Sequence, residues 1–168
     1  MPRSFDMAAE YGASVEQVRG VFCDRDYWLA RLATSGADLY SLDSMADRGA
    51  AGMDIVTTQT MRAARLPAVV TQLHVGDLSA VREEHWDPVI DGQALASVRG
   101  RVRGAPLNIS GRSVLAPIDG GCRLQLRATV EVRIPLLGGK VETMIGQHMK
   151  ELLRLETAFT MAWIADGH

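Results

Sequence analysis

The segment from Cys122 to Ile134 constrains the fold most, because its thirteen residues alternate without a break between apolar and polar side chains. The apolar positions hold Cys, Leu, Ala, Val and Ile, and the polar positions include three arginines. A period of two predicts a long strand with one face toward a core and the other toward solvent. Such a strand belongs to an antiparallel sheet, whose apolar face needs a second layer to cover it.

Further strands are expected on the N-terminal side of this segment. Residues 94–103 alternate in the same way, and residues 107–118 follow after the turn Gly104-Ala105-Pro106. Turn residues at Asp91-Gly92 and Asp119-Gly120-Gly121 separate these segments from their neighbours. Gly100 and Gly111 lie inside strands, where glycine suits sharp bending or a close approach. Four more strands are expected at residues 4–11, 38–45, 53–62 and 79–87.

Helices are expected at four places. Ser14 and Gln17 form a capping box before a short helix, and Asp24 begins a second one that ends near Gly36. Pro67 opens a short helical segment at residues 68–73. From Leu137 to Ala165 one apolar stripe recurs at spacings of three and four, which predicts a long amphipathic helix. The stripe contains Val141, Met144, Ile145, His148, Leu152, Leu155, Phe159, Ala162 and Trp163.

This order of elements predicts an α+β fold. We expect a curved antiparallel sheet of about seven strands wrapped around the long C-terminal helix, with two short helices after the first strand. No repeat or linker divides the chain, so residues 1–168 are expected to form a single domain.

Composition limits the possible partners and location. The chain has 168 residues, 47% of them hydrophobic, and 18 basic against 20 acidic residues. That balance argues against nucleic acid as the main partner, which needs a basic surplus. The longest apolar runs are too short for a transmembrane segment, and the N-terminus lacks the apolar region of a secretory signal. A cytoplasmic location with two reduced thiols, Cys23 and Cys122, is therefore expected.

Three segments resemble a known superfamily, the START, birch-pollen-allergen and polyketide-cyclase (SRPBCC) proteins with a helix-grip fold, and within it an uncharacterised bacterial family. The first runs from Ser14 to Trp28 and is similar to the entry helices of the superfamily. The second is Glu84-His85-Trp86 at the end of a central strand. The third is the turn from Ile134 to Glu142 that leads into the last helix. The resemblance implies an apolar cavity between sheet and helix that binds a lipid, a sterol, a polyketide or another hydrophobic molecule.

Candidate cavity residues follow from the apolar strand faces and the helical stripe. His148 is the most informative, because a polar ring among apolar neighbours is either bonded to backbone or water, or contacts a ligand. Met144 belongs to a set of eight methionines that either fill the core or form a soft-walled pocket. The predicted cavity residues are Met53, Ile55, Trp86, Ala96, Val98, Leu124, Leu126, Met144, His148 and Leu152.

The sequence of residues 79–87 does not decide which face of this predicted strand points toward the cavity. If Trp86 faces the cavity, Arg82 and Glu84 follow it and could anchor a ligand head group. If His85 faces the cavity, Glu83 and Val81 go with it, and a twisted or edge strand that is wet on both faces is a third alternative.

Two surface features carry weaker hypotheses. Val69, Val70 and Leu73 could form a lid over the cavity mouth, or belong to a connector that packs on the core. The arginines of the polar strand faces form either an ordinary solvated surface or a surface for an anionic partner or membrane. They are Arg99, Arg101, Arg103, Arg123, Arg127 and Arg133.

Three functions remain open. The first is a carrier or sensor that binds a hydrophobic small molecule and needs a pocket of roughly 300 Å³. The second is a cyclase- or dehydratase-type enzyme with His148, Tyr40 or Glu84 as acid and base. The third is an interaction protein with a vestigial cavity, which could form a homodimer. The sequence contains no H-E-x-x-H, G-x-S-x-G, P-loop or G-x-G-x-x-G motif, and neither a metal nor a cofactor is expected.

Overall fold

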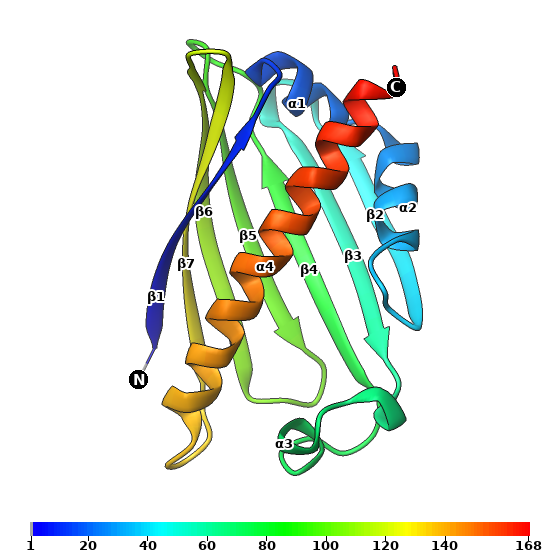
Figure 1. Cartoon of the computed structure of the whole chain (residues 1–168), viewed down its shortest axis with the longest axis vertical. Coiled ribbons are helices and arrows are strands. Elements are labelled where there is room, and N and C mark those ends of the chain that lie inside the picture. The colour runs from blue at the N-terminus through cyan, green and yellow to red at the C-terminus, as the bar shows by residue number, and fades with distance from the viewer. Residues whose placement is uncertain (1) are drawn as a thin grey trace.

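The computed structural model describes residues 2–168 and has the predicted helix-grip fold, with a curved antiparallel sheet and a long helix across one face (Figure 1). The seven strands follow the order β1-β7-β6-β5-β4-β3-β2. They are β1 (Arg3–Tyr11), β2 (Leu39–Asp47), β3 (Met53–Met61), β4 (Leu78–Trp86), β5 (Ala94–Val102), β6 (Leu107–Ile118) and β7 (Gly121–Val132). The helices are α1 (Val15–Val21), α2 (Arg25–Ala33), α3 (Ala68–Thr71) and α4 (Gly138–Ala165), with 3₁₀ turns at Gly49–Ala51 and Ala63–Arg65.

Local sequence signals account for these elements. The Gln17 amide donates to the Ser14 hydroxyl at 3.1 Å, and the Ser14 amide donates to the Gln17 side chain at 3.0 Å, as the capping box requires. Asp24 caps α2 by accepting from the Asp26 amide at 2.9 Å. The segment that alternates most strictly becomes β7, which pairs with β1 on one side and β6 on the other.

The concave face of the sheet forms a hollow with two unlike ends. At one end, called the α1 end, α1 and α2 lie close to the C-terminal part of α4 (Figure 1). There a buried aromatic cluster fills the hollow, with neighbouring ring centroids 4.7–6.3 Å apart. This aromatic cluster comprises Phe22, Tyr27, Trp28, Trp86, Phe159 and Trp163.

The opposite end, called the α3 end, contains α3 and the beginning of α4 (Figure 1). Its concave side chains, such as Val98, Val102 and Ile109, are only partly buried. Gly111 lies among them, and a Cβ atom there would come within 2.9 Å of Val98 and 3.1 Å of Leu126. The strand glycine therefore permits a close approach, as expected.

The stripe predicted on α4 is wrong in its phase. The residues of α4 that are buried are Gly138, Glu142, Gly146 and Thr160, whereas Met144 is 42% and Leu155 is 52% exposed. The helix packs against β1 and β7. A Cβ atom at Gly146 would collide with the ring of Phe5 on β1, so the missing side chain lets helix and strand approach.

Polar residues complete this contact. The Glu142 side chain is fully buried, and its Oε2 accepts a hydrogen bond from the Val132 amide at 2.8 Å. Its Oε1 lies 3.8 Å from Nε of Arg3. Because buried polar groups are tolerated when they are bonded, a face with two glycines and a glutamate packs on the sheet edge. The predicted apolar stripe lies to one side of this contact face and not on it.

Candidate functional site

A cavity of about 190 Å³ lies between α2, α4 and the concave face of β3 and β4. One part of its wall is apolar and comes from Trp28, Leu32, Leu152, Leu155 and Phe159. The other part is polar and comes from Arg31, Thr34, Ser35, Thr57, Gln59, Arg82 and Glu156. The cavity therefore offers apolar surface and charged groups side by side.

The charged groups form one connected ion-pair network. Glu156 of α4 lies between two arginines, and its Oε2 accepts from Arg31 Nη2 at 2.8 Å. Arg82 Nη1 donates to both oxygens of the same carboxylate, at 3.0 and 2.8 Å. Arg82 Nε also lies 3.2 Å from Oε2 of Glu84. Two arginines and two glutamates balance in charge, and their side chains are between 9% and 28% exposed.

A chain of hydrogen bonds ties this network to the aromatic cluster. Arg31 Nη1 donates to the Tyr27 hydroxyl at 3.1 Å, and the Tyr27 hydroxyl shares a bond of 2.7 Å with Thr160. Thr160 in turn donates to the backbone carbonyl of Glu156 at 2.8 Å. The Arg31 guanidinium also lies 4.4 Å from the ring centre of Trp28, which is a cation–π distance. These contacts with Tyr27, Trp28 and Glu156 fix the position of the Arg31 guanidinium in the cavity wall.

The network fixes the charge states in the cavity. Burial by itself would raise the pKa of Glu156, but Arg31 and Arg82 outweigh it, and the pKa lies below its ordinary value. Burial would lower the pKa of Arg31, and the carboxylate of Glu156 outweighs it and raises this pKa. Tyr11, which is buried in the core outside the cavity lining, has its pKa raised by burial. All three groups therefore keep their ordinary charge at neutral pH.

The structure selects one of the alternatives for β4. Trp86 is 3% exposed and faces the hollow, so Arg82 and Glu84 share its face. His85 points to the opposite face, where its ring nitrogens lie 2.5 Å from Asp54 and 3.0 Å from Asp87. An edge strand wet on both faces is excluded, because β4 lies between β3 and β5 and its Trp86 is buried.

The predicted cavity residues separate into three groups. Leu152 lines the cavity. Met53, Ile55, Trp86 and Leu124 are buried in the core, and Ala96 packs against that core. The others are Val98 and Leu126, partly buried in the sheet, and Met144 and His148, exposed on α4. Their part in ligand binding stays a prediction.

The predicted lid lies away from the cavity. Val69, Val70 and Leu73 belong to the connection around α3, and none of the three lines the cavity. Val69 is 40% exposed. The predicted arginine surface is where the strand faces place it, since Arg99, Arg101 and Arg127 are exposed on the convex side.

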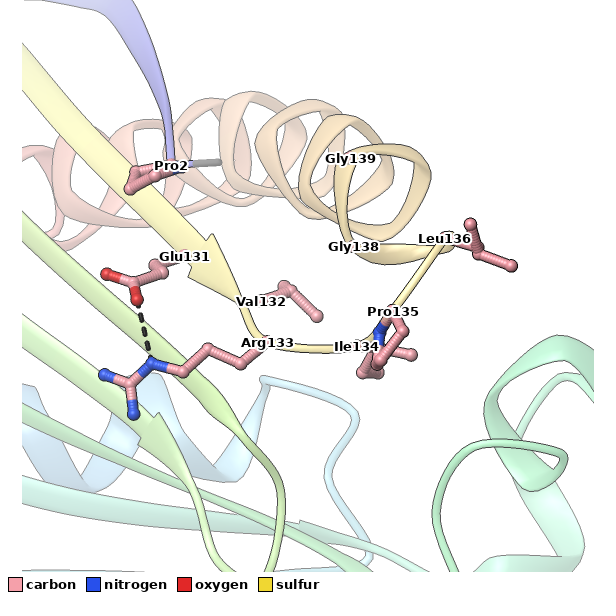
Figure 2. A pocket seen from close by; sticks show the side chains of 9 residues that line it. All are labelled: Pro2, Glu131, Val132, Arg133, Ile134, Pro135, Leu136, Gly138 and Gly139. Atoms are coloured by element: carbon pink, nitrogen blue, oxygen red, sulfur yellow. Dashed lines mark hydrogen bonds and ion pairs between the residues drawn. The ribbon is translucent and has the colours of Figure 1, made fainter.

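A larger depression of about 620 Å³ lies at the α3 end, next to the turn between β7 and α4 (Figure 2). It opens widely to solvent, and its lining residues come from the segments around Pro2 and from Glu131 to Gly139. Arg133 and Glu131, its charged residues, pair with each other at 2.8 Å. We consider the smaller cavity the better candidate because it is more enclosed and contains the charged network.

Sequence reasoning missed Arg31 and Glu156, the two ends of the central ion pair. Glu156 follows the apolar residues Leu152 and Leu155, and Arg31 follows Tyr27 at a spacing of four. A charged residue next to the apolar face of an amphipathic helix is therefore the sequence signal that could have identified Glu156 and Arg31. The pairing joins α2 to α4, so it depends on the tertiary structure.

Residues 2–168 contain neither a metal-binding cluster nor a membrane-spanning helix. No group of three His, Cys, Asp or Glu side chains there is arranged to hold a metal ion. Within the same residues, no helix combines the length and the apolar character needed to cross a membrane.

Comparison with known proteins places the chain in a family. The family described as "Protein of unknown function (DUF2505)" matches residues 6–164, so the chain belongs to it. A relative from Mycobacterium tuberculosis (strain H37Rv), "Uncharacterized protein Rv0481c", is 48% identical over 99% of both chains. "Uncharacterized protein Mb0491c" of Mycobacterium bovis is also 48% identical over 99% of both chains.

Solved structures share the fold at low sequence identity. A START superfamily protein from Mycobacterium smegmatis is similar over 93% of this chain and 96% of that one, with a TM-score of 0.55 and 15% identity. Norcoclaurine synthase from Thalictrum flavum, solved with dopamine and hydroxybenzaldehyde, is similar over 100% of this chain and 89% of that one, with a TM-score of 0.61 and 13% identity. Ara h 8.0201 is similar over 96% of this chain and 99% of that one, with a TM-score of 0.56 and 10% identity. These likenesses establish the helix-grip fold and, by themselves, no function.

Proposed function

We propose that this chain binds a hydrophobic small molecule with a polar head group, as a carrier or sensor, in the hollow between sheet and α4. The observation that carries the proposal is the cavity whose apolar wall adjoins Arg31, Arg82 and Glu156. An apolar body would contact Leu152 and Phe159. A polar head group would exchange hydrogen bonds with the ion-pair network.

The size of the cavity limits the ligand. A volume of about 190 Å³ is smaller than the roughly 300–1,000 Å³ of pockets that enclose drug-sized ligands. A larger lipid, sterol or polyketide would therefore extend from the cavity into the open α3 end of the hollow. The partly buried Val98, Val102 and Ile109 would contact that portion.

The charge states favour binding over acid–base catalysis. A general base works best with a pKa near the working pH, and enzymes raise carboxylate pKa values by burial to reach it. The two arginines instead lower the pKa of Glu156. A carboxylate held ionised by two cations suits a fixed anchor better than a proton carrier.

Native mass spectrometry of the protein purified from its own host tests the proposal. We expect a bound mass in the wild type, and its loss in Leu152→Trp, which fills the cavity. Ala158→Trp is the matched control, because it adds the same side chain at an exposed position of the same helix. A wild type without a bound molecule, or a mass retained by Leu152→Trp, would contradict the proposal.

We further infer that residues 1–168 act as a single domain in the cytoplasm. One continuous sheet uses strands from both ends of the chain, since β1 pairs with β7, and this supports a single domain.

A further inference from the structure

The α3 end of the molecule presents a group of exposed apolar side chains. Leu136, in the turn between β7 and α4, is fully exposed at 103%, and its side chain projects away from the helix (Figure 2). Val75, in the connection between α3 and β4, is 96% exposed. Leu137 and Val69 are 44% and 40% exposed at the same end. We call these four residues the apolar tip.

The backbone at Leu136 adds a second, independent observation. Its φ angle is +67°, in the left-handed region that bulky L-residues rarely adopt. Among residues 2–168, one further non-glycine residue has a positive φ, Asp91, and aspartate tolerates this region much better. Glycine or asparagine at position 136 would relieve the strain, and neither would expose an apolar side chain. An exposed leucine is therefore unfavourable in this turn for the isolated fold.

Charged residues around the tip are mainly basic. The segments 62–77, 103–106 and 131–140, which build this end, contain Arg62, Arg65, Arg103, Arg133 and Lys140 against Asp77 and Glu131, and Asp38 lies beside Arg62 and Arg65. Arg65 pairs with Asp38 and Arg133 with Glu131. Within residues 2–168, no ion pair engages Arg62, Arg103 or Lys140. Exposed apolar side chains within a basic rim match the interface of a membrane that contains anionic lipids.

We propose that the apolar tip docks on the surface of an anionic phospholipid membrane. Leu136 and Val75 would enter the headgroup region, and Arg62, Arg103 and Lys140 would face lipid phosphates. The docking is peripheral, since it needs side chains of two connections and no spanning helix. This inference does not depend on the cavity or on any ligand in it.

Co-flotation with lipid vesicles tests the docking. We expect the wild type to float with phosphatidylcholine vesicles that contain phosphatidylglycerol, and to float less in high salt or with phosphatidylcholine alone. The double variant Leu136→Asn/Val75→Asn should bind about tenfold more weakly or worse, because two apolar side chains no longer enter the interface. Its thermal midpoint should equal or exceed that of the wild type, because asparagine relieves the strain at position 136.

Ile90→Asn supplies the matched control. Ile90 is 64% exposed in the connection between β4 and β5, at the opposite end of the molecule, and its loss should leave flotation unchanged. The proposal is overturned if the wild type does not bind anionic vesicles, or if the double variant binds as well as the wild type. Light scattering gives the other decisive result: a dimer that the double variant dissociates would assign the tip to a second copy of the chain.

Discussion

The two ends of the hollow are built differently, although the same strands run through both. At the α1 end, two short helices and the aromatic cluster fill the hollow as far as the cavity beside α2, and Trp28 is only 1% exposed. At the α3 end, concave residues such as Val102 stay partly exposed, and α4 is held mainly through its contact with β1 and β7. The α1 end therefore supplies most of the packing, and the candidate cavity lies where the aromatic cluster borders the more open part of the hollow.

The largest expected effect tests this division of stability. Trp28→Ala should lower the free energy of unfolding by about 3–5 kcal/mol, because it removes a buried ring and the bond from its Nε1 to the Phe22 carbonyl. Val102→Ala, at the α3 end, should cost about 1 kcal/mol or less. Urea unfolding of both variants measures the difference. Equal losses would mean that stability is spread evenly over the hollow.

The ion-pair network predicts the next effect. Glu156→Gln leaves Arg31 and Arg82 without a balancing charge and should cost about 2–3 kcal/mol. The control Glu151→Gln, at an exposed pair with Arg154 on the same helix, should give no measurable change. Chemical denaturation of both variants compares them. A neutral Glu156→Gln variant would show that solvent already screens the network.

The same carboxylate predicts a loss of stability in acid. Because the pKa of Glu156 is lower in the folded protein, its contribution is present above the ordinary pKa of a glutamate and is lost as the pH falls through the folded value. The wild type should therefore lose more stability than Glu156→Gln on acidification. Parallel pH profiles of the two proteins would refute the assignment.

The packing of α4 on β1 predicts a smaller change in the free energy of unfolding, with opposite signs for two glycine substitutions. Gly146→Ala places a methyl group against Phe5 and should destabilise the protein by about 1–2 kcal/mol. Gly20→Ala in α1 meets open space and should stabilise by up to about 1 kcal/mol through helix propensity. Thermal unfolding distinguishes the signs. If Gly146→Ala also stabilised the protein, close contact between helix and strand would be disproved.

The smallest effect concerns His85 at the α1 end. Its hydrogen bond to Asp54 and, after the opposing effect of burial, its bond to Asp87 raise the pKa of His85. The stabilisation is therefore fully present below about pH 6.5 and is lost as the pH rises through the folded pKa. Because the ring is 36% exposed, the change should stay below about 1 kcal/mol. His85→Gln should flatten this pH dependence, and an unchanged pH profile in that variant would contradict the assignment to His85.

Much of the architecture could be predicted from neighbouring residues. The capping box at Ser14, the turn at Asp91-Gly92 and the alternation from Cys122 gave strands and helices within a few residues of those observed. The candidate site was predicted less well, because Leu152 alone of the ten proposed cavity residues lines the cavity. The sequence predicts Arg82 at the cavity only if Trp86 faces inward, because residues of one strand alternate between its two faces.

The sequence by itself determined which segments become strands and helices, because backbone periodicity and capping act between residues close along the chain. The tertiary structure alone decided which side of α4 meets the sheet. That choice rests on Gly146 against Phe5 and on Glu142 at the Val132 amide, pairs that chain folding brings together. It also decided that Arg31, Arg82 and Glu156 share one cavity, since a buried charge is stable only beside a partner from another element.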